Sequence, residues 1–223
     1  VGIFGGAFDP VHYGHLRPLA AATAAVGIAT THLVPTFHPP HRATPVASFH
    51  DRLHMLRLAV AEFPGFMPDG REANLPAPSY TVRTLASFRA EFGRRPLVLF
   101  LGLDAFLGLP TWHEWQRLLE LAHIAVMARP GYDRAWPAWA RERSVAAPAS
   151  RQREAAGSIF AVAGPQLNVA ARDLRARLAE RETDVTPDSA PTGLGEVVPA
   201  AVLAYIREQG LYRKGDECPP KNR

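Results

Sequence analysis

Short runs of apolar residues alternate with stretches of helical periodicity along the chain. Residues 1–4, 32–35, 97–101 and 123–127 are short and mainly apolar, and the run LVLFL at 97–101 has no polar interruption. Uninterrupted apolar runs are typical of strands in a parallel sheet that is covered on both faces. The four runs therefore predict four buried strands.

Apolar residues recur at helical spacing in several of the segments between and after these strands. The predicted helices span residues 14–26, 48–63, 79–92, 111–121, 173–181 and 199–209. Strands and helices that alternate at these lengths favour βαβ units. We therefore expect an α/β fold of the Rossmann-like type, with a doubly wound parallel sheet and a small helical C-terminal addition.

Polar residues indicate where three of the helices begin. Ser48, with Asp51 three residues later, predicts an N-terminal cap. Thr111 and Glu114 have the spacing of a capping box. Ser79 is expected to cap the helix that follows it.

Two regions show no stable period. Residues 131–157 are rich in Ala, Pro, Arg and Trp, and they predict loops with one short helix. Residues 183–196 have the composition of a loop. We expect residues 1–182 to form the sheet domain and residues 183–223 to add a loop and a helix packed on the same domain.

Composition places the chain among ordinary globular proteins, with 223 residues, 47% hydrophobic and 21% charged. Its one cysteine, Cys218, allows no disulfide or cysteine-based zinc site within the chain. No apolar run approaches the ~20 residues that span a bilayer, so no membrane partner is expected. Gly5, Gly6, Asp9 and His12 interrupt the first apolar run, unlike the core of a signal peptide. A cytoplasmic protein is the expectation.

The positive charge is carried mostly by arginine. The formal net charge is +4 and the pI is near 9.6, with only two lysines, Lys214 and Lys221. A biased codon composition would explain this excess, and so would an anionic partner. Because the arginines are scattered and not clustered, we expect phosphorylated small molecules and no nucleic acid.

The stretch GGAFDPVHYGH, residues 5–15, lies between the first predicted strand and the first predicted helix. That junction is at the carboxyl edge of a doubly wound sheet, where ligands bind. Gly5 and Gly6 let the backbone come close to a ligand, and the helix start at residues 12–14 offers free N–H groups and a positive dipole end. The stretch is therefore suited to bind phosphate.

His12 and His15 lie three residues apart on the first turn of this helix, so they share one face. Imidazole N–H groups can donate to phosphate oxygens. A metal site would need further ligands, and no HExxH pattern or cysteine lies nearby. Histidines that merely complete the core are the other alternative. The glycines and the helix start favour phosphate.

The stretch GGAFDPVHYGH resembles the phosphate-binding signature of the nucleotidyltransferase superfamily, with its HxGH element. Within that superfamily the chain resembles the bacterial nicotinate-mononucleotide adenylyltransferases. The segments that carry this resemblance follow in the same order: VPTFHPPHR, PSYTVRTL, LGLDAF, PTWHEW, ARPGY and VVPAAVLAYIREQGLY. The resemblance implies transfer of AMP from ATP to nicotinate mononucleotide, which gives deamido-NAD and pyrophosphate. It also implies Mg²⁺, held mainly by the ATP phosphates and not by a protein metal site.

The resemblance further implies roles for individual residues. The expected catalytic residues, which would hold the ATP phosphates, are His12, His15 and Arg42. The expected ATP-binding residues are Gly5, Gly6, Ala7, Phe8, Gly102, Asp104, Arg172 and Arg175. The expected mononucleotide-binding residues are Tyr80, Thr81 and Trp112.

The chemistry of these side chains suits their expected roles. Trp112 would stack on the pyridine ring, because a flat aromatic face matches a flat heterocycle, whereas Trp115 is expected to pack inward. Asp104 would accept from ribose hydroxyls, and the helix start at Tyr80 would receive the nicotinate carboxylate. Arg42 stands where the family usually has lysine, which keeps the charge but changes its geometry.

One segment departs from the family. Where the family has ISSTxIR, residues 169–175 read VAARDLR, so Arg175 is kept and three hydroxyl groups are lost. Backbone N–H groups would remain, and Arg172 adds charge, but phosphate binding should weaken. Two alternatives therefore stay open: a nucleotide-binding relative with lost or slowed catalysis, and adenylyl or cytidylyl transfer to another phosphorylated acceptor. Oligomeric state and the preference for the acid or the amide mononucleotide are open as well.

Overall fold

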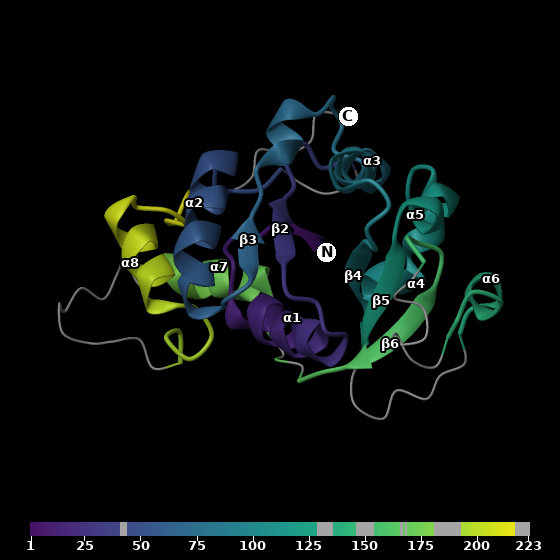
Figure 1. Ribbon diagram of the computed structural model, residues 1–223. Helices are drawn as coiled ribbons and strands as arrows, with labels where there is room; N and C mark the ends of the chain where they lie inside the picture. Colours follow the sequence, from purple (N-terminus) through teal and green to yellow (C-terminus); the bar gives the residue numbers. More distant parts are fainter. Residues whose placement is uncertain are drawn as a thin grey trace.

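The computed structural model describes residues 1–40, 44–128, 136–145, 154–165, 167, 169–180 and 193–216. Its strands form one six-stranded sheet, with all neighbours parallel, in the order β3-β2-β1-β4-β5-β6 (Figure 1). The strands are β1 (Gly2–Gly6), β2 (Thr31–Pro35), β3 (Phe66–Pro68), β4 (Val98–Gly102), β5 (His123–Ala128) and β6 (Ile159–Ala163). The order runs outward in both directions from β1 and β4, so the predicted doubly wound α/β fold is confirmed.

The four predicted strands correspond to β1, β2, β4 and β5, and the two edge strands were not predicted. The strand β3 has only three residues, one of which, Met67, is half exposed. In β6 the exposed positions alternate with buried ones. The strand β3 is too short to show a pattern, whereas β6 reads IFAVA and does carry a continuous apolar run, so the sequence contained its signal.

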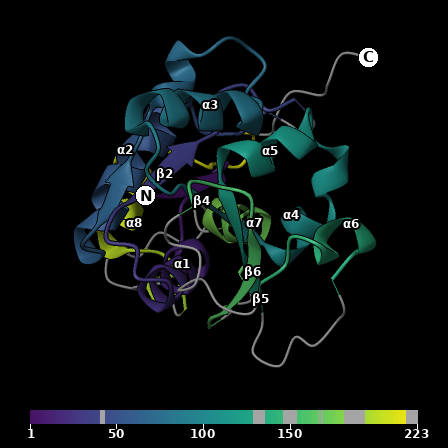
Figure 2. The same cartoon turned by 45° about the vertical axis from the view of Figure 1, so that its right-hand side comes forward.

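Helices cover both faces of the sheet (Figure 2). Two apolar cores lie between the helices and the sheet. The helices are α1 (Tyr13–Ala25), α2 (Phe49–Ala59), α3 (Thr81–Phe92), α4 (Leu103–Leu107), α5 (Trp115–Leu121), α6 (Ala138–Arg141), α7 (Ala171–Glu180) and α8 (Ala200–Glu208). Side chains from α1, α2, α7 and α8 enter one core, and side chains from α3, α4, α5 and α6 enter the other. Successive strand residues face opposite sides, so Ile3 lies in one core and Phe4 in the other.

The predicted cap at Ser48 is confirmed, because its Oγ accepts from the backbone N–H of Asp51 at 3.1 Å. The predicted capping box is wrong. Thr111 lies in a 3-10 turn (Leu109–Thr111), and α5 begins only at Trp115, after Glu114 in the left-handed region at φ 49°.

The predicted cap at Ser79 is also wrong. The residue that precedes α3 is Tyr80, and it makes no side-chain cap. The Oγ of Ser79 instead accepts from the backbone N–H of His38 at 3.0 Å, while the N–H of Ser79 donates to the carbonyl of His38 at 2.9 Å. Ser79 thus ties the start of α3 to the loop after β2, a contact that local sequence does not reveal.

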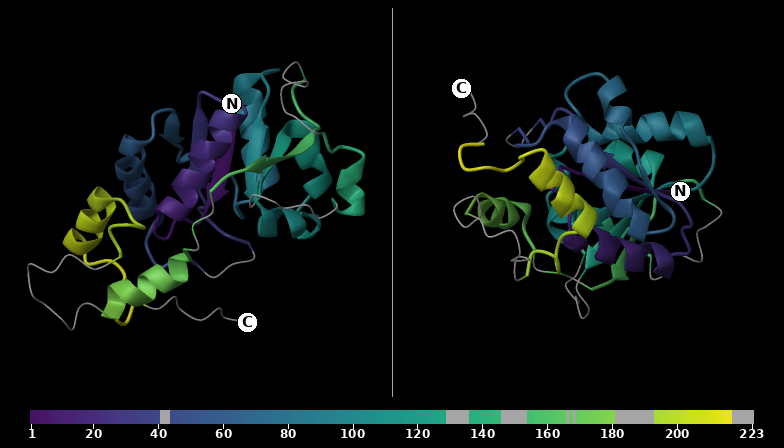
Figure 3. Two further views of the ribbon diagram at one scale, coloured as in Figure 1. Left: turned by 90° about the horizontal axis from the view of Figure 1, so that it is seen from below. Right: turned by 90° about the vertical axis from the view of Figure 1, so that its left-hand side faces the viewer.

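The C-terminal helix packs on the sheet domain. In Figure 3, α8 lies beside α2, and its residues Val202, Leu203 and Ile206 enter the same core as α1 and α2. The proposed domain boundary at residue 182 lies outside the described residues and stays a prediction. The helix α6 is the short helix expected within residues 131–157. Among the described residues, no helix is both long and apolar enough to cross a membrane.

Candidate active site

A cavity of about 850 Å³ lies at the carboxyl ends of β1 and β4. This size fits a nucleotide-sized ligand. It is lined by the loop between β1 and α1, the loop after β2, the start of α3, the end of β4 with α4, and α7. The predicted site residues that line it are Gly5, Gly6, Ala7, Phe8, His12, His15, Tyr80, Thr81, Gly102, Asp104, Trp112, Arg172 and Arg175. Arg42 lies outside the described residues.

The loop between β1 and α1 bends sharply at Phe8. This residue has a φ of 50°, in the left-handed region, and its side chain is fully buried. Its ring meets the ring of His15 edge-on at 5.2 Å and that of Phe4 at 5.8 Å. A side chain at Gly6 would approach the Phe8 ring to 3.2 Å. Packing of this ring therefore fixes the loop around a backbone conformation that few side chains adopt.

His12 and His15 stack face to face, with ring centroids 3.7 Å apart and planes at 28°. His12 is the residue that precedes α1, as expected for a helix start at residues 12–14. The Nδ1 atoms of both rings are inaccessible to solvent and find no hydrogen-bond partner among the described residues. Both histidines line the cavity, so a ligand bound there would lie against their rings.

Burial keeps both histidines neutral. It lowers the pKa of His12 to about 4 and the pKa of His15 well below its ordinary value, and the neighbouring His12 lowers the latter further. A neutral imidazole has one N–H donor and one acceptor nitrogen. At neutral pH the two histidines are therefore uncharged when the cavity is empty, and they can still donate N–H groups to an anion that binds there.

The neutral state of the two histidines predicts how the protein responds to acid. The acid limb of kcat/KM, which reports the pKa values of the free enzyme, should lie near pH 4, well below the usual histidine value of about 6.5. The unfolded chain binds protons at pH values where the native rings do not, so the free energy of unfolding should decrease as pH drops from about 6.5 towards 4. Rate measurements and urea unfolding across this range check both expectations. An acid limb near pH 6.5 would contradict the neutral pair.

Gly14 gives the histidines room. A Cβ at this position would lie 2.8 Å from Nδ1 of His12 and 3.3 Å from Cβ of Val169, in the segment before α7. The first distance is closer than real Cβ atoms approach other atoms, so one of the two groups would have to move. The glycine in HYGH therefore leaves room for the ring of His12 on one side and for Val169 on the other.

Replacing Gly14 with alanine should lower kcat by at least about tenfold, since displacement of a positioning group by ~1 Å can cost far more. The substitution favours the helix itself, so the melting temperature should not fall in parallel with the rate. Gly195→Ala is the matched control, because a Cβ at that position would meet no atom within 4 Å. Steady-state rates and thermal melts of Gly14→Ala and Gly195→Ala test both expectations. A rate within twofold of the wild type would show that the histidine geometry tolerates a methyl group.

The opposite wall of the cavity is aromatic. The rings of Tyr80 and His113 stack at 4.1 Å, with planes at 24°, and Trp112 lies next to His113 in the chain and is partly exposed. His113 was not predicted as a site residue; its one signal in the sequence is its position beside Trp112. Trp115 packs inward as expected, against Trp139 with ring centroids at 5.0 Å.

Glu72 holds this wall against the loop after β2. Its buried carboxylate accepts from the backbone N–H of Phe37 at 3.0 Å and from the Oγ1 of Thr84 at 2.8 Å. Thr84 is in the first turn of α3. The start of α3 and the loop that leads to Arg42 are therefore held together.

Three charged side chains complete the cavity. Asp104 lies exposed in the first turn of α4, directly after β4. Arg175, in α7, donates through Nη1 to the backbone carbonyl of Asp9 at 2.7 Å. Arg172 is 88% exposed and its nearest acidic partner, Asp173, is 3.6 Å away. The helix begins at Ala171, two residues earlier than predicted.

The described residues include no group of three or more histidine, cysteine or acidic side chains that could hold a metal ion. A cation that binds in the cavity would therefore take most of its ligands from a bound substrate and from water. This is the usual arrangement for Mg²⁺ on nucleotide phosphates.

Comparisons with known proteins give a consistent family. The cytidylyltransferase-like family model matches residues 3–177. The chain is 43% identical over 218 residues to a curated protein of Aeromonas hydrophila named "Probable nicotinate-nucleotide adenylyltransferase", covering 96% of this chain and 97% of that one. A protein of the same name from Serratia proteamaculans is 40% identical over 217 residues, covering 95% and 94%.

Solved structures show the same fold. The nicotinic acid mononucleotide adenylyltransferase of Plasmodium falciparum complexed with NaAD aligns with a TM-score of 0.69 over 95% of this chain and 96% of that one, at 15% identity. The same enzyme complexed with APC aligns with a TM-score of 0.67, at 16% identity.

Proposed function

The chain belongs to the nicotinate-nucleotide adenylyltransferases of the cytidylyltransferase-like family, and we propose that its cavity transfers AMP from ATP to nicotinate mononucleotide. The products are deamido-NAD and pyrophosphate, on the route to NAD. One observation carries the proposal. A single cavity contains the start of α1, with its neutral histidine pair, and an aromatic wall beside the start of α3.

The reaction joins two anionic substrates. An oxygen of the mononucleotide phosphate attacks the α-phosphorus of ATP, and the bond from that phosphorus to the bridging oxygen breaks as pyrophosphate leaves in line. Such transfers depend on positioning and on stabilising negative charge, and they need no covalent help from the protein. The absence of a nucleophilic role for any side chain is therefore part of the proposal.

The ATP half of the site is built around the loop between β1 and α1. His12 and His15 donate N–H groups to the phosphates, and the start of α1 adds its dipole. Arg175 and Arg172 add positive charge from α7, and Asp104 accepts from a ribose hydroxyl. Arg42 is proposed for the same phosphates from the loop after β2.

The mononucleotide half is built around the start of α3. Trp112 stacks on the pyridine ring, and the backbone N–H groups at Tyr80 and Thr81 receive the carboxylate of nicotinate. A helix N-terminus attracts an anion more strongly than a neutral amide. We therefore propose that the acid mononucleotide is preferred over its amide.

Mg²⁺ fits this site as an ion carried by the ATP phosphates, because the described residues form no cage for it. When bound, it neutralises charge on the departing pyrophosphate. The residues of this chain position the phosphates on which the ion sits, through His12, His15 and Arg175.

The segment at the start of α7 keeps groups that can bind phosphate, although three hydroxyl groups are missing. The helix start at Ala171 lines the cavity, and Arg175 is anchored to Asp9. These contacts favour an active enzyme over a relative that binds nucleotide without transferring it. A cytoplasmic location and the lack of a nucleic-acid or membrane partner remain part of the proposal.

The test is pyrophosphate release by the purified protein with ATP and Mg²⁺, in the presence of nicotinate mononucleotide, its amide, or neither. The acid should give turnover at rates typical of enzymes, the amide less, and EDTA should abolish both. ATP binding without turnover on either mononucleotide would favour the relative with lost catalysis. Thermal stabilisation by a different phosphorylated compound, and not by the mononucleotide, would favour transfer to another acceptor.

A further inference from the structure

We propose that Tyr212 is a positioning residue for the ATP half of the site, and that it acts through Asp9 on Arg175. The residue ends the segment VVPAAVLAYIREQGLY, 197–212, to which the proposed function gives no role. The inference rests on the proposed function only in that the cavity binds ATP. It extends the site to a residue 203 positions away from Asp9 in the chain.

Asp9 has a full set of partners. It is 4% exposed, and its Oδ1 accepts from the hydroxyl of Tyr212 at 2.9 Å and from the N–H of Ala47 at 3.0 Å. Its Oδ2 accepts from the N–H of Val46 at 2.8 Å and lies 3.5 Å from Nη1 of Arg175. A buried carboxylate with donors on both oxygens is held in one orientation, and loss of the Tyr212 hydroxyl would remove one of the two hydrogen bonds at Oδ1 and loosen it.

Arg52 fixes the surroundings of Asp9. Its guanidinium is fully buried and donates to the carbonyls of Ala7 at 2.7 Å, Thr36 at 2.8 Å and Ala47 at 3.2 Å. The buried guanidinium of Arg52 thus holds together the loop between β1 and α1 and the segment before α2. Tyr212 and Arg175 each bond to Asp9 and supply none of the acceptors of Arg52, so replacing either side chain leaves the hydrogen bonds of the buried guanidinium in place.

Arg175 links this network to the cavity. Its Nη1 donates to the backbone carbonyl of Asp9 at 2.7 Å and lies 3.5 Å from the Asp9 carboxylate, while the side chain is 28% exposed and lines the cavity. The described residues give no hydrogen-bond partner to its Nε and Nη2 atoms. Asp9 therefore sets where the free edge of this guanidinium lies, and a guanidinium binds phosphate through two nitrogens in a fixed geometry.

The backbone at Tyr212 is held in an uncommon conformation to make this contact. Its φ is 64°, in the left-handed region, and its side chain is only 3% exposed. A non-glycine residue at such an angle costs free energy that its surroundings must supply. Burial and the neighbouring Asp9 raise the pKa of Tyr212 far above its usual range, so its hydroxyl stays a donor at every working pH.

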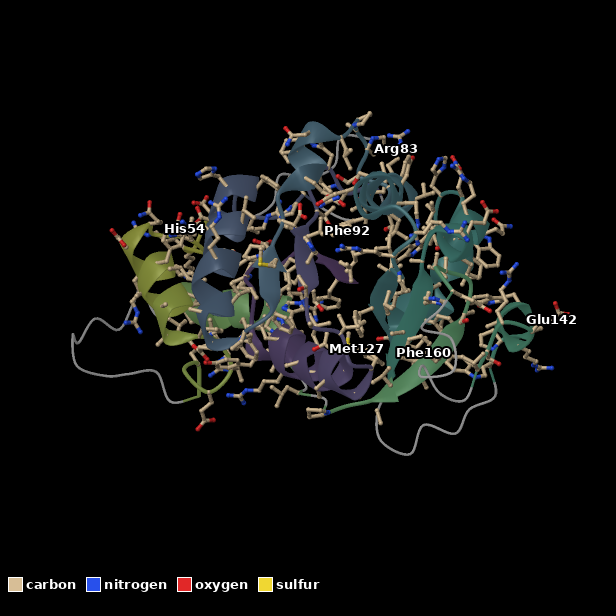
Figure 4. The ribbon with its side chains drawn as sticks, viewed as in Figure 1. His54, Arg83, Phe92, Met127, Glu142 and Phe160 are labelled. Atoms are coloured by element: carbon tan, nitrogen blue, oxygen red, sulfur yellow. The ribbon has the colours of Figure 1, made fainter. Side chains whose placement is uncertain are left out.

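Tyr205 provides a matched control. It lies on α8, a few residues before Tyr212, and its hydroxyl donates to Oδ1 of Asp51 at 2.8 Å. The two tyrosines thus make the same type of bond from the same C-terminal segment, one to the site and one to α2. Figure 4 labels His54, whose ring lies 4.5 Å from that of Tyr205, beside α8.

The experiment measures the Kd of ATP by equilibrium titration, without a mononucleotide, for the wild type, Tyr212→Phe and Tyr205→Phe. Loss of one hydrogen bond that orders a charged pair should raise the Kd of Tyr212→Phe about fivefold to tenfold. Its KM for nicotinate mononucleotide should stay within about twofold of the wild type, and Tyr205→Phe should leave both values within about twofold. Equal ATP affinities in the two variants, whatever their melting temperatures, would overturn the proposal.

A double-mutant cycle tests the route through Arg175. In the Arg175→Gln background, Tyr212→Phe should raise the Kd of ATP by less than about twofold, because the positioned group is gone. An undiminished effect of Tyr212→Phe in that background would overturn the proposed route. This test is separate from the test of the proposed function. A wild type that binds ATP but forms no dinucleotide would contradict only the proposed function. A wild type that binds no ATP would contradict both the proposed function and the role of Tyr212.

Discussion

Replacing His15 with alanine should lower kcat by about two to three orders of magnitude, while the protein remains folded. One hydrogen-bond donor to developing charge, in a site shielded from water, is typically worth that much. His15 stacks on His12 at 3.7 Å and contacts Phe8. The variant therefore loses the N–H donor of His15, and the ring of His12 loses the neighbour that holds it in place. The expected loss is in kcat more than in KM, because the negative charge on the phosphates is greatest in the transition state.

The control for His15 is His54→Ala. This histidine lies on α2, beside α8, and does not line the cavity. Its replacement should leave kcat within about twofold of the wild type. Circular dichroism and thermal melts of both variants establish that they are folded. An unchanged kcat in folded His15→Ala would contradict the phosphate role of the pair.

Replacing Trp112 with alanine should raise the KM for nicotinate mononucleotide by about tenfold to a hundredfold, since stacking of a base on an aromatic ring is worth ~1–3 kcal/mol. The KM for ATP should stay within about twofold. Trp112→Phe keeps a flat ring and should recover most of the affinity. Initial rates with each substrate varied in turn separate the two constants.

Trp115 is the matched control for Trp112. It lies three residues further along and packs against Trp139 in the core. Trp115→Ala should lower the free energy of unfolding through the cavity it leaves, with both KM values little changed. If Trp112→Ala changed only the KM for ATP, the assignment of the aromatic wall at Trp112 to the pyridine ring would be refuted.

The predictable part of the fold consists of elements whose signal is local. The run LVLFL indicates β4 because a central parallel strand is apolar on both faces. The edge strand β3 was missed because three residues show no pattern, whereas β6 was missed although its sequence, IFAVA, is apolar throughout. The boundaries of α3 and α5 were misplaced because Ser79 bonds to His38 and Glu114 takes a left-handed conformation, and neither is a property of the nearby sequence.

The candidate site divides in the same way. GGAFDPVHYGH predicts a phosphate loop, since glycines, a turn and a helix start stand together in one short stretch. The partners of Asp9 could not be predicted, because Tyr212 and Arg175 reach it from far along the chain. Long-range packing decides these contacts, and one sequence carries no local sign of them.

The most direct test of the account follows the α-phosphate of ATP. With nicotinate mononucleotide, Mg²⁺ and ATP labelled at the α-phosphate, the label should appear in deamido-NAD, and label at the γ-phosphate should appear in pyrophosphate. Label at the α-phosphate that stays in ATP, or that appears as free AMP, would contradict adenylyl transfer in this cavity.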